Sequence, residues 1–274
     1  MKKIMYRLML IGLLLLFGTK AKAVQEADNV LYLPFDEGEG KTAKDTSPHK
    51  NDGIFQENAK WAKGKYGNSL SLDGDKGDWV EVPDSPSLDI TDQITLMAWV
   101  YPTRFTAAWY RIVVKHWAKN EAPWMVYGLG QVGGTNGKTS FIISVDGGTE
   151  GRLDPSPFGP EGDKPEDTPA LKPKVWTHLA STYDGKEMKL YYDGEVVAKK
   201  SIEGKLDTND VSLAIGGNNI QNHEYYPGRI DEVAIWKVAL SKNEIQEAME
   251  RVYAIESQSK LSTSWGFVKK QYIE

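Results

Sequence analysis

The sequence predicts an all-β protein, a sandwich of two antiparallel sheets with one short C-terminal helix. Three observations support this class. Most apolar segments are short, rich in β-branched or aromatic residues, and separated by turn residues. Asp-Gly pairs at 184–185 and 193–194 join alternating runs, which is a strong hairpin signal. Only one segment, near the C-terminus, has the period of an amphipathic helix, so strands should dominate the fold.

About twelve strands are expected along the chain. They cover residues 31–35, 69–72, 79–82, 94–101, 111–115, 124–129, 139–145, 176–183, 187–192, 195–200, 211–215 and 229–236. The runs between 176 and 200 form an antiparallel meander, and the Asp-Gly turns need positive φ at both turn residues. In the middle run, alternate residues share a face, which predicts one buried face carrying Met188, Leu190 and Tyr192.

The one predicted helix begins after a capping box. Ser241 is followed three residues later by Glu244, so each side chain can satisfy a free backbone N–H at the first turn. An apolar stripe at helical spacing then predicts packing against a sheet: Ile245, Ala248, Met249 and Val252.

Residues 1–23 have the pattern of a secretory signal. Lys2, Lys3 and Arg7 precede an apolar stretch at 8–17, and an A-x-A cleavage site ends at Ala23. The stretch is short for the roughly 30 Å of a bilayer core, although a single membrane anchor is the alternative. Five basic residues and no acid lie in this segment, so cleavage changes the formal charge from -5 to -10. We therefore expect an acidic protein exported to the periplasm or outside the cell, with no membrane span after signal removal.

Composition limits the function classes further. The chain has no cysteine, which excludes disulfides, thiolate zinc sites and cysteine nucleophiles. Its net negative charge argues against a nucleic-acid partner. No linker divides the chain, so we expect one domain over 28–253 and a polar tail at 254–274. A proline-rich stretch at 154–173 predicts a long surface loop, and such loops are often functional.

Seven motifs occur in order and at characteristic spacing. They are L-P-F-D-E at 33–37, S-L-S-L-D-G at 69–74, W-V-E-V-P-D-S-P-S-L-D-I at 79–90, M-A-W-V-Y-P at 97–102, W-T-H at 176–178 with T-Y-D-G at 182–185, L-Y-Y-D-G at 190–194, and G-R-I-D-E-V-A-I-W at 228–236. Together they resemble the laminin G-like, concanavalin A-like lectin/glucanase domains of secreted bacterial proteins, over about residues 29–253. The resemblance implies a jelly-roll fold but no particular ligand.

The resemblance also implies a structural calcium near the paired first and last strands. Matching motif positions are Asp36 and Asp231, with Asn51 and Asp52 as weaker candidates. Calcium prefers six to eight oxygen ligands of the kind that such loops supply. The alternative is that these residues form turns or surface carboxylates. The acidic segment at 73–84 fails the EF-hand pattern and is interpreted as a charged hairpin loop.

The sequence carries no recognisable catalytic pattern. A retaining glycosidase needs two carboxyl groups about 5–5.5 Å apart, and no E-x-D-x-E run supplies them. Neither H-E-x-x-H nor G-x-S-x-G occurs. We therefore expect a protein that is not an enzyme. A hydrolase or lyase with an unmarked site is the remaining catalytic alternative.

Aromatic and planar polar residues gather in loop-rich segments, and these side chains suit sugar binding. The predicted ligand-binding residues are Trp109, Arg111, His116, Trp117, Trp124, Asn218, Asn222, His223 and Tyr225, with Tyr110, Tyr226, Gln131 and Asn219 as companions. The first hypothesis is a non-catalytic carbohydrate-binding module. The second is an extracellular structural or adhesive module whose partner is a protein.

Overall fold

The computed structural model describes residues 26–106, 108–119, 121–153, 169–220 and 223–250. The predicted signal at 1–23, the tail at 254–274 and most of the proline-rich loop lie outside the described residues. The domain limits 28–253 and the signal therefore stay predictions. Within the described part, no helix is both long and apolar enough to cross a membrane.

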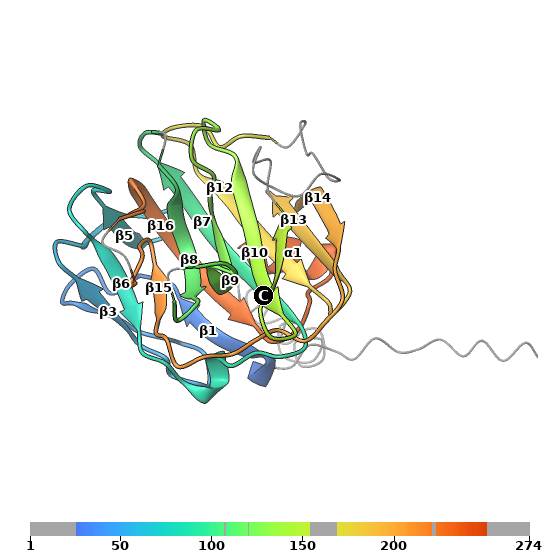
Figure 1. The fold of residues 1–274 in the computed structure, drawn as a ribbon. Coiled ribbons are helices and arrows are strands. Elements are labelled where there is room, and N and C mark those ends of the chain that lie inside the picture. Colours follow the sequence, from blue (N-terminus) through green and yellow to red (C-terminus); the bar gives the residue numbers. More distant parts are fainter. Residues whose placement is uncertain (1–25, 107, 120, 154–168, 221–222, 251–274) are drawn as a thin grey trace, which may run out of the picture.

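Two eight-stranded antiparallel sheets lie face to face (Figure 1). The first sheet has the order β14-β13-β12-β7-β16-β5-β4, and β1 also pairs with β16. Its strands are β1 (Asn29–Leu33), β4 (Lys60–Lys63), β5 (Asn68–Leu72), β7 (Ile94–Pro102), β12 (Thr177–Tyr183), β13 (Glu187–Tyr192), β14 (Glu195–Ser201) and β16 (Gly228–Trp236).

The second sheet has the order β11-β10-β9-β8-β15-β6-β3-β2. Its strands are β2 (Thr42–Ala43), β3 (Gly53–Gln56), β6 (Trp79–Val82), β8 (Tyr110–His116), β9 (Met125–Gln131), β10 (Thr139–Val145), β11 (Thr149–Leu153) and β15 (Leu213–Ile215). Short 3₁₀ helices η1 (Glu26–Asp28) and η2 (Pro86–Leu88) complete the set. The predicted all-β sandwich is confirmed.

The main hydrophobic core fills the space between the sheets. Phe141 and Ile143 from β10 meet Leu179 and Leu190 from the opposite sheet in this cluster. A second cluster lies on the outer side of the first sheet, where helix α1 (Lys242–Glu250) contributes Ile245 and Ala248. The expected capping box is present, because the Ser241 N–H donates to Glu244 at 2.6 Å and the Glu244 N–H donates to the Ser241 hydroxyl at 3.4 Å.

Several local predictions need correction. The short strands β2, β3, β4 and β11 were not predicted, because they have few β-branched residues and three of them, β2, β4 and β11, are edge strands. The loop at 73–78 is not a hairpin, since it joins β5 of the first sheet to β6 of the second. The meander is buried on both faces at Tyr191, which packs in the cluster beside α1.

The two Asp-Gly turns also differ from each other. Asp193 and Gly194 both have positive φ, at +47° and +77°, as the hairpin signal requires. At the other turn only Gly185 has positive φ. Asp184 instead accepts hydrogen bonds from the N–H groups of Lys186 and Glu187 with its side chain, which closes a wider turn.

Candidate binding pocket

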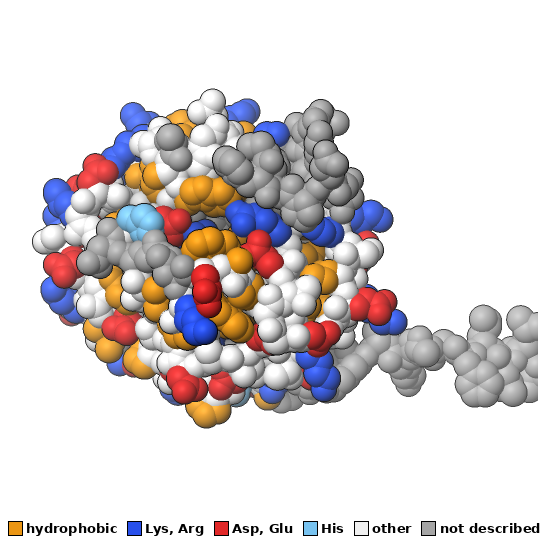
Figure 2. All heavy atoms as spheres, viewed as in Figure 1, with side chains coloured by type: hydrophobic (Ala, Val, Ile, Leu, Met, Phe, Trp, Pro, Cys, Tyr) orange, Lys and Arg blue, Asp and Glu red, His pale blue; other side chains and the backbone are white. Residues whose placement is uncertain are grey.

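A cavity of about 450 Å³ opens on the outer face of the second sheet. Figure 2 looks onto this face, where hydrophobic and basic side chains lie together around the hollow. On β10, Ile142 lines the cavity, while Phe141 and Ile143 point into the core, because successive strand residues face opposite sides. The described lining residues are Trp109, Arg111, His116, Trp117, Lys119, Trp124, Met125, Ile142, Arg152, Asn218, Ile220, His223 and Glu224.

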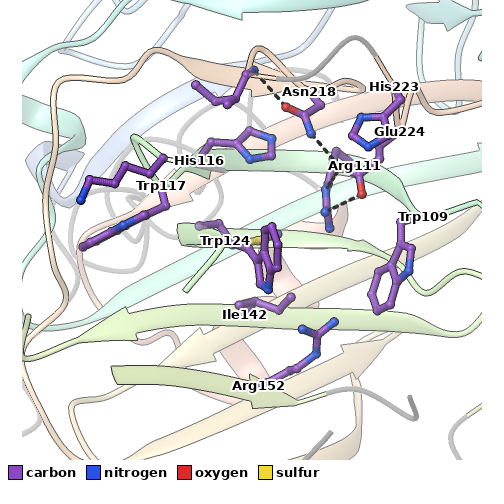
Figure 3. Close-up of a pocket in the computed structure, with 13 residues that line it drawn as sticks. Trp109, Arg111, His116, Trp117, Trp124, Ile142, Arg152, Asn218, His223 and Glu224 are labelled. Atoms are coloured by element: carbon purple, nitrogen blue, oxygen red, sulfur yellow. Dashed lines mark hydrogen bonds and ion pairs between the residues drawn. The ribbon is translucent and has the colours of Figure 1, made fainter. Parts of the chain in front are cut away.

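Three tryptophans surround the cavity. Trp117 and Trp124 stand at the two ends of the β8–β9 connection, where the Trp117 N–H donates to the Trp124 carbonyl at 3.0 Å. Figure 3 shows Trp124 between Trp117 on one side and Trp109 on the other. Trp124 keeps 42% of its surface exposed, and its φ of +42° is unusual for a bulky residue. Such outliers cost free energy and cluster at ligand sites.

A buried ion pair forms one wall of the pocket. The Arg111 guanidinium donates from Nε and Nη2 to the two carboxylate oxygens of Glu224, at 2.9 and 2.8 Å. The Asn218 side chain donates to the same carboxylate at 2.7 Å and accepts from the Ile220 N–H (Figure 3). Bidentate pairs of this kind fix geometry as well as charge. The wall is therefore a rigid polar surface positioned by β8 and by residues 218–220 and 223–224.

Arginine side chains also lie against an indole. The guanidinium carbon of Arg152 is 4.9 Å from the ring centre of Trp109, and that of Arg111 is 5.9 Å from it. Both distances are in the range of cation–π attraction. Arg152 also pairs with Glu150 at 3.3 Å. Trp109 therefore lies near two guanidinium groups in the lining of the pocket.

His116 is the most deeply buried titratable side chain that points into the pocket. Only 4% of the residue is exposed, and no described group bonds to its Nε2. Burial, together with the nearby Arg111 charge, lowers the pKa of His116 to about 3. The imidazole is therefore neutral at physiological pH.

The structure brings seven of the nine predicted ligand-binding residues together in this one pocket. They are Trp109, Arg111, His116, Trp117, Trp124, Asn218 and His223. Tyr225 is not in it, because its ring lies against Gly77 and Gly217. Asn222 lies outside the described residues. The ligand-binding role of the seven stays a prediction.

The four companion residues are not among the described residues that line the pocket. Tyr110 and Tyr226 are buried and meet edge to face in the core, with ring centres 6.5 Å apart. The Asn219 side chain donates to the Ser212 carbonyl. Gln131 is fully buried on β9 and does not line the pocket.

Sequence reasoning missed six lining residues: Lys119, Met125, Ile142, Arg152, Ile220 and Glu224. Alternation along β10 and β11 would have placed Ile142 and Arg152 on one outer face, had the short β11 been recognised. Glu224 directly follows the predicted residue His223, but its role as partner of Arg111 depends on a long-range contact that local sequence does not reveal.

The four residues predicted to bind calcium make other interactions. The Asp231 carboxylate accepts from the N–H groups of Lys65, Tyr66 and Glu232, and Asp36 accepts from the Asn68 N–H. Both acids therefore hold the 64–68 loop against the strands.

Asn51 and Asp52 also have partners. Asn51 donates its side-chain amide to the Val30 carbonyl and to Ser87, while Asp52 pairs with Lys44 at 2.7 Å. Across the described residues, no three His, Asp or Glu side chains gather as a metal site would require. As arranged, these residues do not fit calcium, and calcium binding stays an untested prediction.

The described part of the pocket does not offer paired carboxylates. Among its described lining residues, Glu224 is the only Asp or Glu, and its oxygens already bond to Arg111 and Asn218. Glycoside hydrolysis ordinarily needs an acid and a second carboxylate across the bond that breaks. The geometry is suited to holding a ligand.

Residues 73–246, well over half of the chain, match the family model Laminin_G_3, described as the concanavalin A-like lectin/glucanases superfamily. The chain belongs to this superfamily, which the motifs had predicted. With the sheets and the pocket, this defines a concanavalin A-like binding domain.

Two curated relatives are similar over a short segment. Pappalysin-1 of Mus musculus is 36% identical over 107 residues, and pappalysin-1 of Homo sapiens is 36% identical over 104 residues. These matches cover 36% and 35% of this chain but only 6% of each relative. The likeness therefore concerns one small part of much longer proteins.

Solved structures share the fold at low identity. The binding domain of Paraclostridial Mosquitocidal Protein 1 has a TM-score of 0.62 and 17% identity, covering 83% of this chain and 53% of that one. Domain 4 of AbnA, a GH43 extracellular arabinanase from Geobacillus stearothermophilus solved with arabinotriose, has a TM-score of 0.59 and 21% identity, covering 80% of this chain and 97% of that one. The botulinum neurotoxin serotype D ligand binding domain, solved with N-acetylneuraminic acid, has a TM-score of 0.59 and 17% identity, covering 82% of this chain and 51% of that one. At these identities the likeness shows the fold alone.

Proposed function

We propose that the chain is an exported, non-catalytic module that binds a glycan in the pocket on the second sheet. The observation that carries the proposal is the set of three indoles, Trp109, Trp117 and Trp124, around a cavity with fixed polar groups. Sugar rings present apolar C–H faces to aromatic side chains and hydroxyls to planar polar groups. Small-ligand pockets typically combine such apolar walls with a few fixed polar groups.

Two further facts support this function. The described lining of the pocket has one carboxylate, which is already paired with Arg111, so the chemistry of these residues favours ligand binding over hydrolysis. Two structural neighbours of the same fold were solved with sugars bound, arabinotriose in one and N-acetylneuraminic acid in the other. Export through the segment at 1–23 would bring the module to glycans outside the cytoplasm, and it is part of the proposal.

A glycan array tests the proposal. The purified protein and a Trp117→Ala/Trp124→Ala double variant are compared on the same array, with and without calcium. The control is Tyr66→Ala, which removes an exposed aromatic, 39% accessible, outside the pocket. We expect the wild type and the control to bind the same glycans and the double variant to lose them. Glycan binding that survives in the double variant would refute the assignment of the binding site to this pocket. An array on which the wild type binds no glycan would favour a protein partner.

A further inference from the structure

Among the described residues that line the pocket, three have cationic side chains, and each has a carboxylate partner. Arg111 pairs with Glu224 through two hydrogen bonds, and both side chains are largely buried, at 9% and 13% exposed. Arg152 pairs with Glu150, and Lys119 at the exposed rim lies 3.5 Å from Glu121. An anionic ligand would have to compete with these carboxylates, so charge gives it little advantage.

One polar atom in the pocket wall lacks a described partner. Nε2 of His116 is buried and bonds to no described group, and Figure 3 shows the imidazole directed toward Asn218 and Arg111. A buried polar atom without a partner is unfavourable and needs an explanation. Because His116 lines the open cavity, its Nε2 is the candidate atom for a hydrogen bond to a bound ligand.

The protonation state of His116 restricts that ligand atom. Burial keeps the imidazole neutral, since it lowers the pKa to about 3. A neutral imidazole has one nitrogen that donates and one that accepts. A hydroxyl can pair with Nε2 in either tautomer because it both donates and accepts, whereas a carboxylate can only accept.

The floor beside this atom is apolar. Met125 and Ile142 form a small cluster with Val114 and Ala214 on the outer face of the sheet, and the partly exposed Trp124 lies in the same cavity. Such a floor favours the C–H face of a sugar ring over a charged substituent, which would lose its hydration there.

We infer that the pocket selects a neutral sugar, oriented by a hydroxyl that hydrogen-bonds to Nε2 of His116. This inference rests on the proposed glycan-binding function and specifies the class of sugar. His116 is then the residue that fixes the ring's orientation, while the indoles supply contact area. The paired arginines form the wall without drawing in an acidic group.

The test is isothermal titration against a fixed panel. The neutral members are arabinotriose, xylotriose, cellotriose and mannotriose, and the acidic members are trigalacturonic acid and 3′-sialyllactose. We expect a neutral trisaccharide to bind most tightly. An acidic sugar as the tightest ligand would overturn the inference while leaving the proposed function intact. A panel without any binding would overturn the proposed function itself.

The role of His116 is tested with the tightest neutral member. His116→Leu should weaken binding about tenfold, because a buried hydrogen bond is lost. His116→Gln, which retains a donor and an acceptor, should recover much of that affinity. His49→Leu, on the chain segment before β3 and outside the pocket, is the matched control. Equal affinity of wild type and His116→Leu, with unchanged melting temperatures, would refute the assignment.

Discussion

The two outer faces of the sandwich differ in how their apolar side chains are covered. On the first sheet, helix α1 covers a cluster containing Trp236, Tyr191 and Met97, and these residues are at most 3% exposed. On the second sheet, Met125 and Ile142 lie under an open pocket, and Trp124 remains 42% exposed. One face is covered by the chain itself, whereas the other is available to a ligand. Trp236 is therefore buried on one face, whereas Trp124 on the other face is exposed, where we propose that it contacts the ligand.

The covered face should show the largest effect on stability. Trp236→Ala removes a side chain that is 2% exposed and leaves a cavity beside α1. We expect it to lower the free energy of unfolding by about 3–5 kcal/mol, measured by urea denaturation. Val196→Ala, at a residue 43% exposed on β14, should change it by less than about 0.5 kcal/mol. Similar values for the two variants would contradict the packing of this face.

Variants of the pocket wall should have the next largest effect on the free energy of unfolding. Glu224→Ala leaves the Arg111 guanidinium buried without its partner, so we expect a loss of about 3 kcal/mol together with lost ligand binding. The matched control is Glu195→Ala, which breaks an exposed pair with Lys242 and should cost less than about 1 kcal/mol. If both variants cost equally little by chemical denaturation, the wall is not the rigid element described above.

Asp231 and Glu232, on β16 of the first sheet, should make the free energy of unfolding depend on pH. Burial raises the pKa of Asp231 to about 8 and that of Glu232 to about 7, whereas unfolded chains have values near 4. Between pH 4 and 8 the folded protein thus binds more protons than the unfolded chain. The free energy of unfolding should therefore fall as pH rises through this window, by several kcal/mol between pH 5 and 8.

Thermal unfolding at a series of pH values measures this slope. Asp231→Asn should reduce the slope, because the amide does not titrate in this range. Asp75→Asn, at an exposed aspartate, should leave it unchanged. A wild-type stability that rises from pH 5 to 8 would show that these carboxyl groups are ionised in the folded protein.

The open face should show a small effect on stability and a large one on binding. Trp124→Gly removes the exposed indole and places glycine at a φ of +42°, a value that glycine tolerates well. We expect a change of less than about 1 kcal/mol in the free energy of unfolding, while glycan binding is lost. Large destabilisation in calorimetry would mean that Trp124 belongs to the core, as Trp236 does.

Calcium should have the smallest effect. The Asp36 and Asp231 carboxylates already accept backbone N–H groups, so the described arrangement gives a metal little to bind. We expect the melting temperature in EDTA and in millimolar calcium to agree within about 1 °C, since an ion that does not bind cannot stabilise. A clear rise with calcium, lost in Asp231→Ala, would establish the calcium site that the family resemblance implies.

Sequence reasoning predicted the sandwich well because its signals are local. The alternation of Met188, Leu190 and Tyr192 and the capping box at Ser241 are determined by neighbouring residues, and the structure has both. Pairings between distant segments were not accessible in the same way. The partnership of Arg111 with Glu224 joins residues 113 positions apart, and the 73–78 loop crosses between sheets, which no turn residue encodes.

The same limit applies to the site. Aromatic and polar residues in loop-rich segments indicated seven lining residues. Tyr225 is of the same residue type and lies in the same kind of segment, but its ring contacts Gly77 and Gly217 instead of the pocket. Charge and family motifs suggested calcium, while the hydrogen bonds of Asp231 depend on how the 64–68 loop packs against β16. Residue type is readable from sequence, but the direction of a side chain depends on tertiary packing.

The most direct test of the central claim is an NMR titration that follows the indole N–H signals, each assigned by a single Trp→Phe variant. The ligands are the four neutral trisaccharides of the titration panel. We predict that the signals of Trp109, Trp117 and Trp124 shift with one of these trisaccharides, while those of Trp236 and Trp61 remain in place. Shifts confined to Trp236 and Trp61, or no shift of any indole with any trisaccharide, would contradict the claim that the open face binds a glycan.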